Sequence, residues 1–343
     1  MKAIIWVPVT IAILARAHRR KSLTPLGLLA AAITAAVHAL PHSPLPFTLL
    51  GTFFIIGTSA TKVKHAEKAK LTLSASGGSG GEGARTHVQV LANSACASVL
   101  CLVEFLMRKD RTIGLGEECL ALRSSNSQNP YLDICLMGVV ANYAAVAADT
   151  FSSELGILSR SKPFLITDLR RKVPKGTNGG ITPAGVAYGH LGALAIAVTS
   201  VMLLPFCAEW SFNSRALFVA CVSAWGTIGS LLDSLLGARL QASVIDRRTG
   251  KIVEGAGGAK VKTRSGSVAI ADGNHATGSH DTAARQRKVG AGTETKSAEA
   301  NGHDSRLINS GKDVLDNNGI NILMAAIMTT GGIVLGQMAR AVV

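Results

Sequence analysis

Two acidic motifs, each at the end of a long apolar segment, hold the residues of this chain best suited to chemistry. The first runs from Asp149 to Glu154 and beyond, and the second begins at Asp233. A carboxylate at the end of a membrane helix is costly unless it pairs or binds a ligand, so such an acid is a candidate functional group. Asp149, Glu154 and Asp233 are therefore predicted to be catalytic and to bind Mg²⁺, a hard cation that prefers oxygen ligands.

Polar residues recur at the spacing of one helix face near the ends of four apolar segments. In hydrocarbon such faces must turn toward protein or toward a water-filled cavity. For any single amide, a hydrogen bond that only holds the helices together is the favoured interpretation, whereas four stripes at one depth with several acids favour a site. The four stripes are Arg85, Gln89 and Asn93; Asn142, Asp149 and Ser153; Gly229, Asp233, Gly237 and Gln241; and Asp313, Asn317 and Asn321.

A basic, glycine-rich loop follows the first acidic motif. It carries Lys172, Lys175, Thr177 and Asn178 shortly before an apolar segment that begins near Thr182. A glycine-rich turn that leads into a helix N-terminus offers backbone N–H groups and a favourable dipole to an anion, and either threonine can cap the helix. The alternative is an ordinary cytoplasmic loop that obeys the positive-inside bias. Carboxylates beside this loop indicate Mg²⁺ and a phosphorylated substrate.

The elements that must position these residues are membrane helices. Hydrophobic residues reach 48%, charged residues 16% and aromatic residues only 4%, a balance typical of closely packed helices rich in small residues. A soluble bundle would need amphipathic stripes, whereas these segments are apolar nearly all round. The sequence predicts an all-α integral membrane protein, a polytopic bundle of about eight transmembrane helices in one domain, residues 1–343. The expected spans are roughly 3–16, 22–40, 44–60, 88–107, 131–149, 181–206, 214–236 and 319–339.

The charges of the loops predict an orientation. Lys and Arg gather in the loops after the first, third, fifth and seventh spans, whereas the loops after the second and sixth carry none. Basic loops stay in the cytoplasm, so we expect a lumenal N-terminus, in the endoplasmic reticulum or another endomembrane, and both acidic motifs at the cytoplasmic face. The fourth loop is less decisive because its bases are partly offset by acids. The sequence Ala15-Arg16-Ala17 also fits a signal-peptide cleavage site, but the basic cluster after it favours a retained span.

Two polar segments interrupt the bundle. Residues 72–84 are expected to form a flexible loop, and residues 245–310 a mostly disordered cytoplasmic insertion, because neither has a core-forming pattern. Gly78, Gly80 and Gly83 match the dinucleotide fingerprint formally, but no strand is expected before them. A short β-hairpin is expected with its turn at Thr249-Gly250.

Charge and cysteine usage exclude other classes. The formal net charge of +14 lies beside the expected spans, which indicates anionic headgroups or phosphorylated substrates and not nucleic acid. Four of the cysteines fall inside expected spans, and no C-x-x-C pair occurs, so neither a disulfide framework nor a zinc site is predicted. The six are Cys96, Cys101, Cys119, Cys135, Cys207 and Cys221.

Several of these motifs, in this order, resemble the transmembrane protein 19 family, also described as the domain-of-unknown-function 92 family of integral membrane proteins. The likeness covers about residues 20–340 without the two polar segments. The family includes the plant phytyl-phosphate kinase. The resemblance therefore implies a Mg²⁺-dependent kinase that phosphorylates isoprenoid or polyprenyl monophosphates with CTP or ATP at the cytoplasmic membrane face. The matching pieces are residues 57–62, 85 with 89–93, 148–156, 173–180, 233–237 with 241, and 316–321.

Two hypotheses of function follow. In the kinase, cationic and amide side chains would bind the membrane lipid or isoprenoid phosphate and the nucleoside triphosphate. The alternative is a multi-pass membrane carrier or scaffold protein without enzymatic activity. A carrier predicts polar residues that reach the opposite face and two repeated halves; here polarity is confined to one end, although the second acidic motif echoes the first. The residues expected at substrate or phosphate are Lys62, Arg85, Gln89, Asn93, Lys172, Lys175, Thr177, Asn178, Asp316, Asn317 and Asn321.

Overall fold

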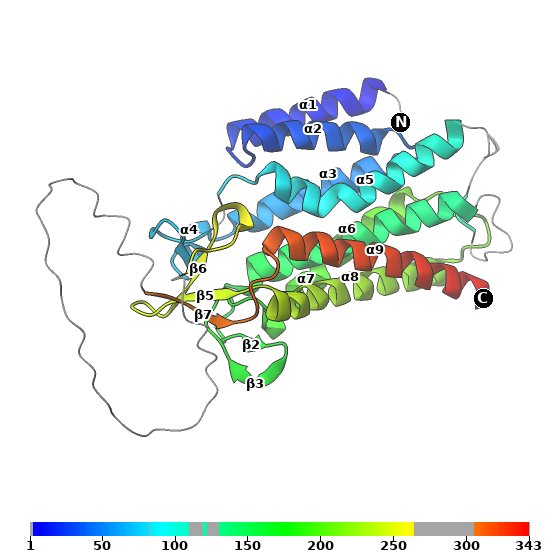
Figure 1. Ribbon diagram of the computed structural model, residues 1–343. Coiled ribbons are helices and arrows are strands. Elements are labelled where there is room, and N and C mark those ends of the chain that lie inside the picture. Colours follow the sequence, from blue (N-terminus) through cyan, green and yellow to red (C-terminus); the bar gives the residue numbers. More distant parts are fainter. Residues whose placement is uncertain (1–2, 82, 110–118, 122–129, 264–304, 343) are drawn as a thin grey trace, which may run out of the picture.

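The computed structural model describes residues 3–81, 83–109, 119–121, 130–263 and 305–342, and these form a mostly helical molecule. Its long helices run side by side in one bundle, with both termini at the same end (Figure 1). The helices are α1 Ala3–Arg19, α2 Pro25–Ala39, α3 Leu45–Lys62, α4 His65–Lys68, α5 His87–Lys109, α6 Pro130–Gly156, α7 Pro183–Leu203, α8 Phe212–Leu240 and α9 Asn317–Val342.

Every apolar segment expected to span the membrane is a helix. Five of the described helices, α5 to α9, are long and apolar enough to cross a bilayer, and α2 is apolar but shorter, at 15 residues. The count of about eight spans therefore stays a prediction. Large apolar side chains such as Val99, Met202 and Leu217 are exposed on the outside of the bundle, as expected where helices face lipid.

Helix α6 is the central helix of the bundle, and 83% of its apolar, membrane-spanning stretch is buried. Glycines on the neighbouring helices allow this burial. A Cβ added at Gly192 of α7 would lie 2.5 Å from the Ala147 carbonyl oxygen, and one at Gly226 of α8 would lie 2.5 Å from that of Ala144. Small residues let backbones approach closely in membrane bundles. The C-terminal end of α6, which carries Asp149, is thereby surrounded by other helices.

At one end of the bundle the connecting segments form two small sheets, so the prediction of an all-α protein is wrong in this respect. The four-stranded sheet has the order β1-β6-β5-β7, and the three-stranded sheet has the order β3-β2-β4. Strand β1 is parallel to β6, and the other pairs are antiparallel. The strands are β1 Leu73–Ser74, β2 Phe164–Leu165, β3 Asp168–Lys172, β4 Gly180–Ile181, β5 Ser243–Asp246, β6 Lys251–Glu254 and β7 Arg306–Ser310.

The larger sheet corrects the limits of both polar segments. Residues 73–74 pair with β6, and both ends of the 245–310 segment contribute strands, whereas residues 264–304 lie outside the described part. The expected hairpin is confirmed, with Thr249 and Gly250 in the turn between β5 and β6. The physical reason is local: Val244, Ile252 and Val253 are buried, and β-branched side chains favour strands. The polar composition of the whole segment hid this short apolar stretch.

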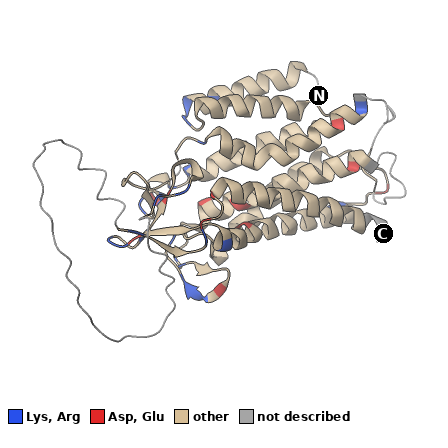
Figure 2. Ribbon diagram, viewed as in Figure 1, with Lys and Arg blue, Asp and Glu red and all other residues tan. Residues whose placement is uncertain are grey.

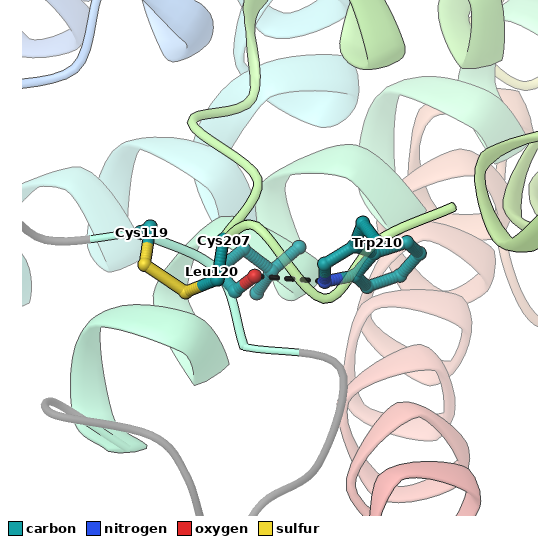
Figure 3. The surroundings of a disulfide bond; sticks show 4 residues. All are labelled: Cys119, Leu120, Cys207 and Trp210. Carbon is teal, nitrogen blue, oxygen red and sulfur yellow. Dashed lines mark hydrogen bonds between the residues drawn. A yellow bond between two sulfur atoms is a disulfide. The ribbon is translucent and has the colours of Figure 1, made fainter. Parts of the chain in front are cut away.

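A disulfide between Cys119 and Cys207 joins two loops at the opposite end of the bundle (Figure 3). The prediction of no disulfide is therefore wrong. The Leu120 backbone N–H donates to the Pro205 carbonyl over 2.7 Å, and the Trp210 indole N–H donates to the Leu120 carbonyl over 2.8 Å. The partners lie 88 residues apart in sequence. No local spacing of cysteines could predict this pair, because the two loops come together only when the helices pack into the bundle.

Candidate functional site

A cavity of about 700 Å³ lies where the ends of the helices meet the two sheets. Its lining comes from α5, α6, α8 and α9 and from the loops before α5, before α7 and after β6. The polar stripes seen in the sequence therefore converge at one end of the bundle. Of the residues predicted for the site, this cavity brings together Arg85, Gln89, Asn93, Asp149, Glu154, Lys175, Thr177, Asn178, Asp233, Asp316, Asn317 and Asn321.

Two predicted phosphate-binding lysines do not line this cavity. Lys62 is exposed at the end of α3, and Lys172 is exposed on β3, where its Nζ lies 5.8 Å from the centre of the Phe164 ring. Lys172 was predicted from the basic character of its loop, and Lys62 from the motif at residues 57–62 that resembles the family. Loop charge follows the positive-inside bias, and that bias does not require a lysine to point into a site.

Two of the carboxylates that line the cavity come from neighbouring membrane helices. Asp149 comes from α6 and Asp233 from α8, two helices that pack against each other. With its amide nitrogen turned toward the acid, Asn321 of α9 donates to Asp233 Oδ2 over 3.1 Å and to the Asn317 carbonyl over 3.2 Å. The third helix thus fixes the orientation of Asp233. Mg²⁺ is usually bound by one or two carboxylates together with water and substrate phosphate oxygens. Asp149 and the oriented Asp233 are a pair of this kind.

Glu154, the third predicted metal ligand, is engaged by a lysine. Lys68 Nζ contacts Glu154 Oε2, and it also donates to the carbonyls of Ala60, at 3.2 Å, and Thr61, at 2.7 Å. Both charged side chains are almost buried, with exposed fractions of 8% and 13%. Among the described residues no group of three or more His, Cys, Asp or Glu could hold a metal ion. The predicted three-acid cluster is therefore absent from this part of the chain, and Asp149 and Asp233 remain.

Arg85 lies at the edge of the cavity nearest α3. Its Nη2 donates to Thr61 Oγ1 over 3.1 Å, and its backbone N–H donates to the Ser22 carbonyl over 3.0 Å. The guanidinium also lies against α3 at Gly57, where a Cβ would be 3.6 Å from Arg85 Nη1, an ordinary van der Waals contact. A held guanidinium, with its planar set of donors, is well suited to phosphate oxygens.

Glycine-rich turns from three loops form the rim of the cavity. Gly81, Gly176, Gly179 and Gly257 all have positive φ, between 61° and 101°. Gly179 also packs tightly, because a Cβ at that position would lie 2.4 Å from the Cβ of Ala238 on α8. Turns of this kind present backbone N–H groups toward an anion. The rim is therefore suited to bind the phosphates of a nucleotide or lipid.

Several predicted binding residues also hold helix ends in place. The Gln89 side-chain oxygen accepts from the Thr86 backbone N–H over 2.9 Å, and Thr86 Oγ1 accepts from the Gln89 N–H over 3.4 Å. This reciprocal pair is a capping box at the start of α5. Asn93 Nδ2 donates to the Gln89 carbonyl over 3.0 Å. For these amides, the interpretation as structural hydrogen bonds accounts for the contacts seen.

The loop before α7 is fixed in a similar way. Thr182 caps α7 by accepting from the Gly185 N–H over 3.0 Å, which decides between the two threonines considered. Asn178 Nδ2 donates to the Ala242 carbonyl over 3.1 Å, and Lys175 Nζ donates to the Ser159 carbonyl over 2.6 Å. At the start of α9, Asp316 Oδ1 caps the helix by accepting a hydrogen bond from the Gly319 N–H over 2.8 Å. These contacts shape the rim on which the phosphate hypothesis rests.

Glu254 at the end of β6 is a cavity residue that the sequence did not single out. Burial raises the pKa of Glu254 above its usual value, and the charge of Glu154 raises it further, while hydrogen bonds from Gly81 and Thr72 oppose the shift. The Gly81 N–H donates to Glu254 Oε2 over 3.2 Å. An acid inside the expected disordered insertion carried no signal in the sequence, because its position depends on the β6 pairing.

The fold and the cavity define an integral, multi-pass membrane protein with a polar site at one membrane surface. The chain matches the family described as Integral membrane protein DUF92 over residues 8–329, and it belongs to that family. It is 33% identical to Protein PGR of Arabidopsis thaliana over 262 residues, which are 76% of this chain and 85% of that protein.

Two further relatives match smaller parts of the chain. Uncharacterized membrane protein MJ0933 of Methanocaldococcus jannaschii is 44% identical over 143 residues, 38% of this chain and 56% of that protein. Protein VTE6, chloroplastic, of Arabidopsis thaliana is 25% identical over 219 residues, 64% of this chain and 56% of that protein. No solved structure matches.

Proposed function

We propose that this protein is a kinase that transfers a phosphoryl group from a nucleoside triphosphate to an isoprenoid or polyprenyl monophosphate. The observation that carries the proposal is one cavity at the end of the bundle that holds Asp149, Asp233 and Arg85 under a rim of glycine-rich turns. Phosphoryl transfer depends mainly on positioning and on neutralising charge. The similarity to Protein VTE6 and the resemblance to the phytyl-phosphate kinase support the same reaction class.

Asp149 and Asp233 would hold Mg²⁺ in this reaction, and Asn321 would keep Asp233 oriented toward it. Magnesium prefers one or two carboxylates, with water and phosphate oxygens in its remaining positions. When bound, the ion supplies positive charge to the phosphate groups. Glu154 is assigned to the ion pair with Lys68 and not to the metal.

The protein groups would bind the two phosphorylated substrates in line. Arg85 would hold the lipid phosphate at the edge of α3, and the rim at Gly176 and Gly179 would hold the nucleotide phosphates. An oxygen of the lipid phosphate attacks the γ-phosphorus, and the bond to the oxygen that bridges the β- and γ-phosphates breaks. The products are the lipid diphosphate and the nucleoside diphosphate. The attacking oxygen is already ionised, so no side chain has to remove a proton.

We further propose that the cavity faces the cytoplasm and the disulfide end faces the lumen or exterior of an endomembrane. Lys and Arg gather at the sheet end and at the nearby end of α1 (Figure 2), which supports a cytoplasmic position for that end. Disulfides persist in oxidising compartments, and the Cys119–Cys207 bond lies at the other end. The organelle is a separate question, since one relative is named as chloroplastic.

A direct assay tests the proposal. Purified protein is incubated with Mg²⁺, with γ-labelled CTP or ATP, and with phytyl, geranylgeranyl or longer polyprenyl monophosphates. Label should move to a lipid diphosphate with at least one combination of donor and acceptor. If no combination yields labelled lipid, and solutes instead cross reconstituted vesicles through the protein, the carrier hypothesis replaces the kinase.

A further inference from the structure

A second, mainly apolar cavity of about 80 Å³ lies beside the main one, between α1, α2, α3 and α5. Aliphatic and aromatic side chains form most of its wall, among them Ile13, Ala35, Leu50, Phe47 and Phe54. The main site uses none of these side chains. A polar nucleotide has no reason to enter such a space, whereas a hydrocarbon chain has.

The two cavities are neighbours that share three lining residues. Arg85, Gln89 and Asn93 line both of them. The guanidinium of Arg85 is held against α3 by Thr61 Oγ1. A ligand with a phosphate at Arg85 and an apolar chain in the smaller cavity would therefore have a charged partner at one end and hydrocarbon contacts at the other.

The smaller cavity extends along α3 away from the sheet end. Its lining includes Phe54 and Phe47, two turns apart on that helix, which is about 10 Å along the axis. Helix α3 ends beside α4 and the sheets (Figure 1), so Phe47, near the start of α3, lies farther from the sheets than Phe54. The wall is thus directed toward the hydrocarbon part of the membrane.

On this basis, and resting on the kinase function proposed above, we infer that the apolar cavity binds the hydrocarbon chain of the lipid substrate. The substrate class is a monophosphate on a single flexible apolar chain, which enters sideways from the bilayer between α1, α2, α3 and α5. The cavity is small, so it takes only the part of the chain next to the phosphate, and the rest stays in lipid. Arg85 marks the boundary between headgroup and chain.

Gly51 of α3 offers a way to close this cavity. A Cβ at Gly51 would meet Ile13 Cδ1 at 4.0 Å and no other atom within that distance. The Cβ of a new side chain therefore fits here, and the indole of Gly51→Trp, which is larger than the cavity, should occupy it completely, whereas Gly51→Ala leaves it open. Ala220→Trp, at an exposed position of α8, controls for a new tryptophan on the bundle surface.

The experiment measures the Kd of the full-length protein in nanodiscs for geranylgeranyl monophosphate, without nucleotide. We expect Gly51→Trp to weaken binding at least tenfold, and Gly51→Ala and Ala220→Trp to bind like the wild type. In parallel, a geranylgeranyl monophosphate with a diazirine on its first isoprene unit should label peptides from α1, α2, α3 or α5.

The outcomes separate this inference from the function on which it rests. If Gly51→Trp binds as tightly as Gly51→Ala, or if label appears only on α7 or α8, the chain does not use this cavity, although the kinase proposal stands. Equal weakening by Gly51→Trp and Ala220→Trp also overturns the inference. If the wild type binds no isoprenoid monophosphate at all, the proposed function fails, and this inference fails with it.

Discussion

Lys68 and Glu154 form a nearly buried ion pair that ties the short helix α4 to the end of α6, beside the cavity. A buried pair is costly to break, because one charge is left uncompensated, although its replacement by two apolar groups can be neutral. Lys68 Nζ also donates hydrogen bonds to the backbone carbonyls of Ala60 and Thr61. The pair therefore anchors the end of α3 nearest the sheets through α4.

Breaking this pair should destabilise the protein strongly. Lys68→Met or Glu154→Met alone is expected to lower stability by ~3–5 kcal/mol, and the double variant Lys68→Met/Glu154→Met should lose clearly less than the sum of the two. Thermal unfolding of the four proteins in detergent measures this. Additive losses would show that the two side chains do not interact.

The buried carboxyl group of Glu254 should make the folding stability of the protein depend on pH. Burial holds the pKa of Glu254 above its unfolded value, so its charge opposes folding above the folded pKa, and this cost disappears as pH falls below the unfolded pKa. Glu254→Gln keeps an oxygen for the Gly81 N–H. The variant should melt at a higher temperature than the wild type at neutral pH, and the gain should vanish in acid. A lower or pH-independent melting temperature would contradict the burial argument.

Among single residues, most of those predicted for the site line the cavity, and the acids gave the clearest signal. Asp149 and Asp233 stand out because carboxylates are rare in apolar helices. Lys68 does not stand out, because it is one basic residue among several in a loop, and its burial depends on contacts with α6 that are 86 residues away. Lys62 and Lys172 show the converse error, since a charge in the right loop lies outside the cavity.

At the scale of elements, the loop before α7 controls the shape of the rim. Gly179 has φ +77°, and it packs against Ala238 and the Ser234 carbonyl of α8. Any side chain at this position would face both backbone strain and a clash. The loop is therefore held at one distance from α8, the helix that carries Asp233.

Gly179→Ala should move this loop and weaken nucleotide binding. Gly77→Ala is the matched control, because Gly77 has φ +90° and a Cβ there would meet no atom within 4 Å. Both variants bear the cost of a side chain at positive φ, about 1–2 kcal/mol, but only Gly179→Ala adds the clash. We expect a weaker Kd for the nucleotide in Gly179→Ala alone, measured by calorimetry. Equal effects of the two variants would remove the special role of this loop.

The sequence predicted helices better than sheets for a physical reason. An apolar run near twenty residues is sufficient evidence for a membrane helix, and each expected span is a helix. The β5–β6 hairpin was also recognisable from its turn. The four-stranded sheet was not, because it joins β1, β5 and β7 from segments far apart in sequence, and strands two to five residues long leave little pattern.

At the scale of the whole molecule, the cavity lies at the sheet end of the bundle and the disulfide lies at the other end. Cys119 and Cys207 both follow helices that run away from the sheets. The charges of the loops predict that both loops lie on the same side of the membrane. This shared side is the sequence feature that could have suggested the disulfide. In the proposed orientation, the bundle separates a reducing, nucleotide-containing side from an oxidising one.

Loss of the disulfide should affect stability and leave the chemistry intact. Cys207→Ser is expected to lower stability by ~2–4 kcal/mol and to leave phosphoryl transfer near the wild-type rate at low temperature, since the bond is far from the cavity. Cys221→Ser, an exposed free cysteine on α8, is the control. An impermeant maleimide should label Cys119 and Cys207 from the lumenal side only, and only after reduction. Labelling from the cytoplasmic side would reverse the proposed orientation.

The central claim is that Asp233 takes part in Mg²⁺-dependent phosphoryl transfer, and one measurement tests it most directly. Transfer of labelled γ-phosphate to an isoprenyl monophosphate is compared in the wild type, Asp233→Asn and Asp168→Asn, an exposed acid on β3 outside the cavity. We predict transfer that requires Mg²⁺, a loss of at least about 100-fold in Asp233→Asn with the fold retained, and full activity in Asp168→Asn. Undiminished transfer by a folded Asp233→Asn protein would show that the Asp233 carboxylate is not needed for phosphoryl transfer.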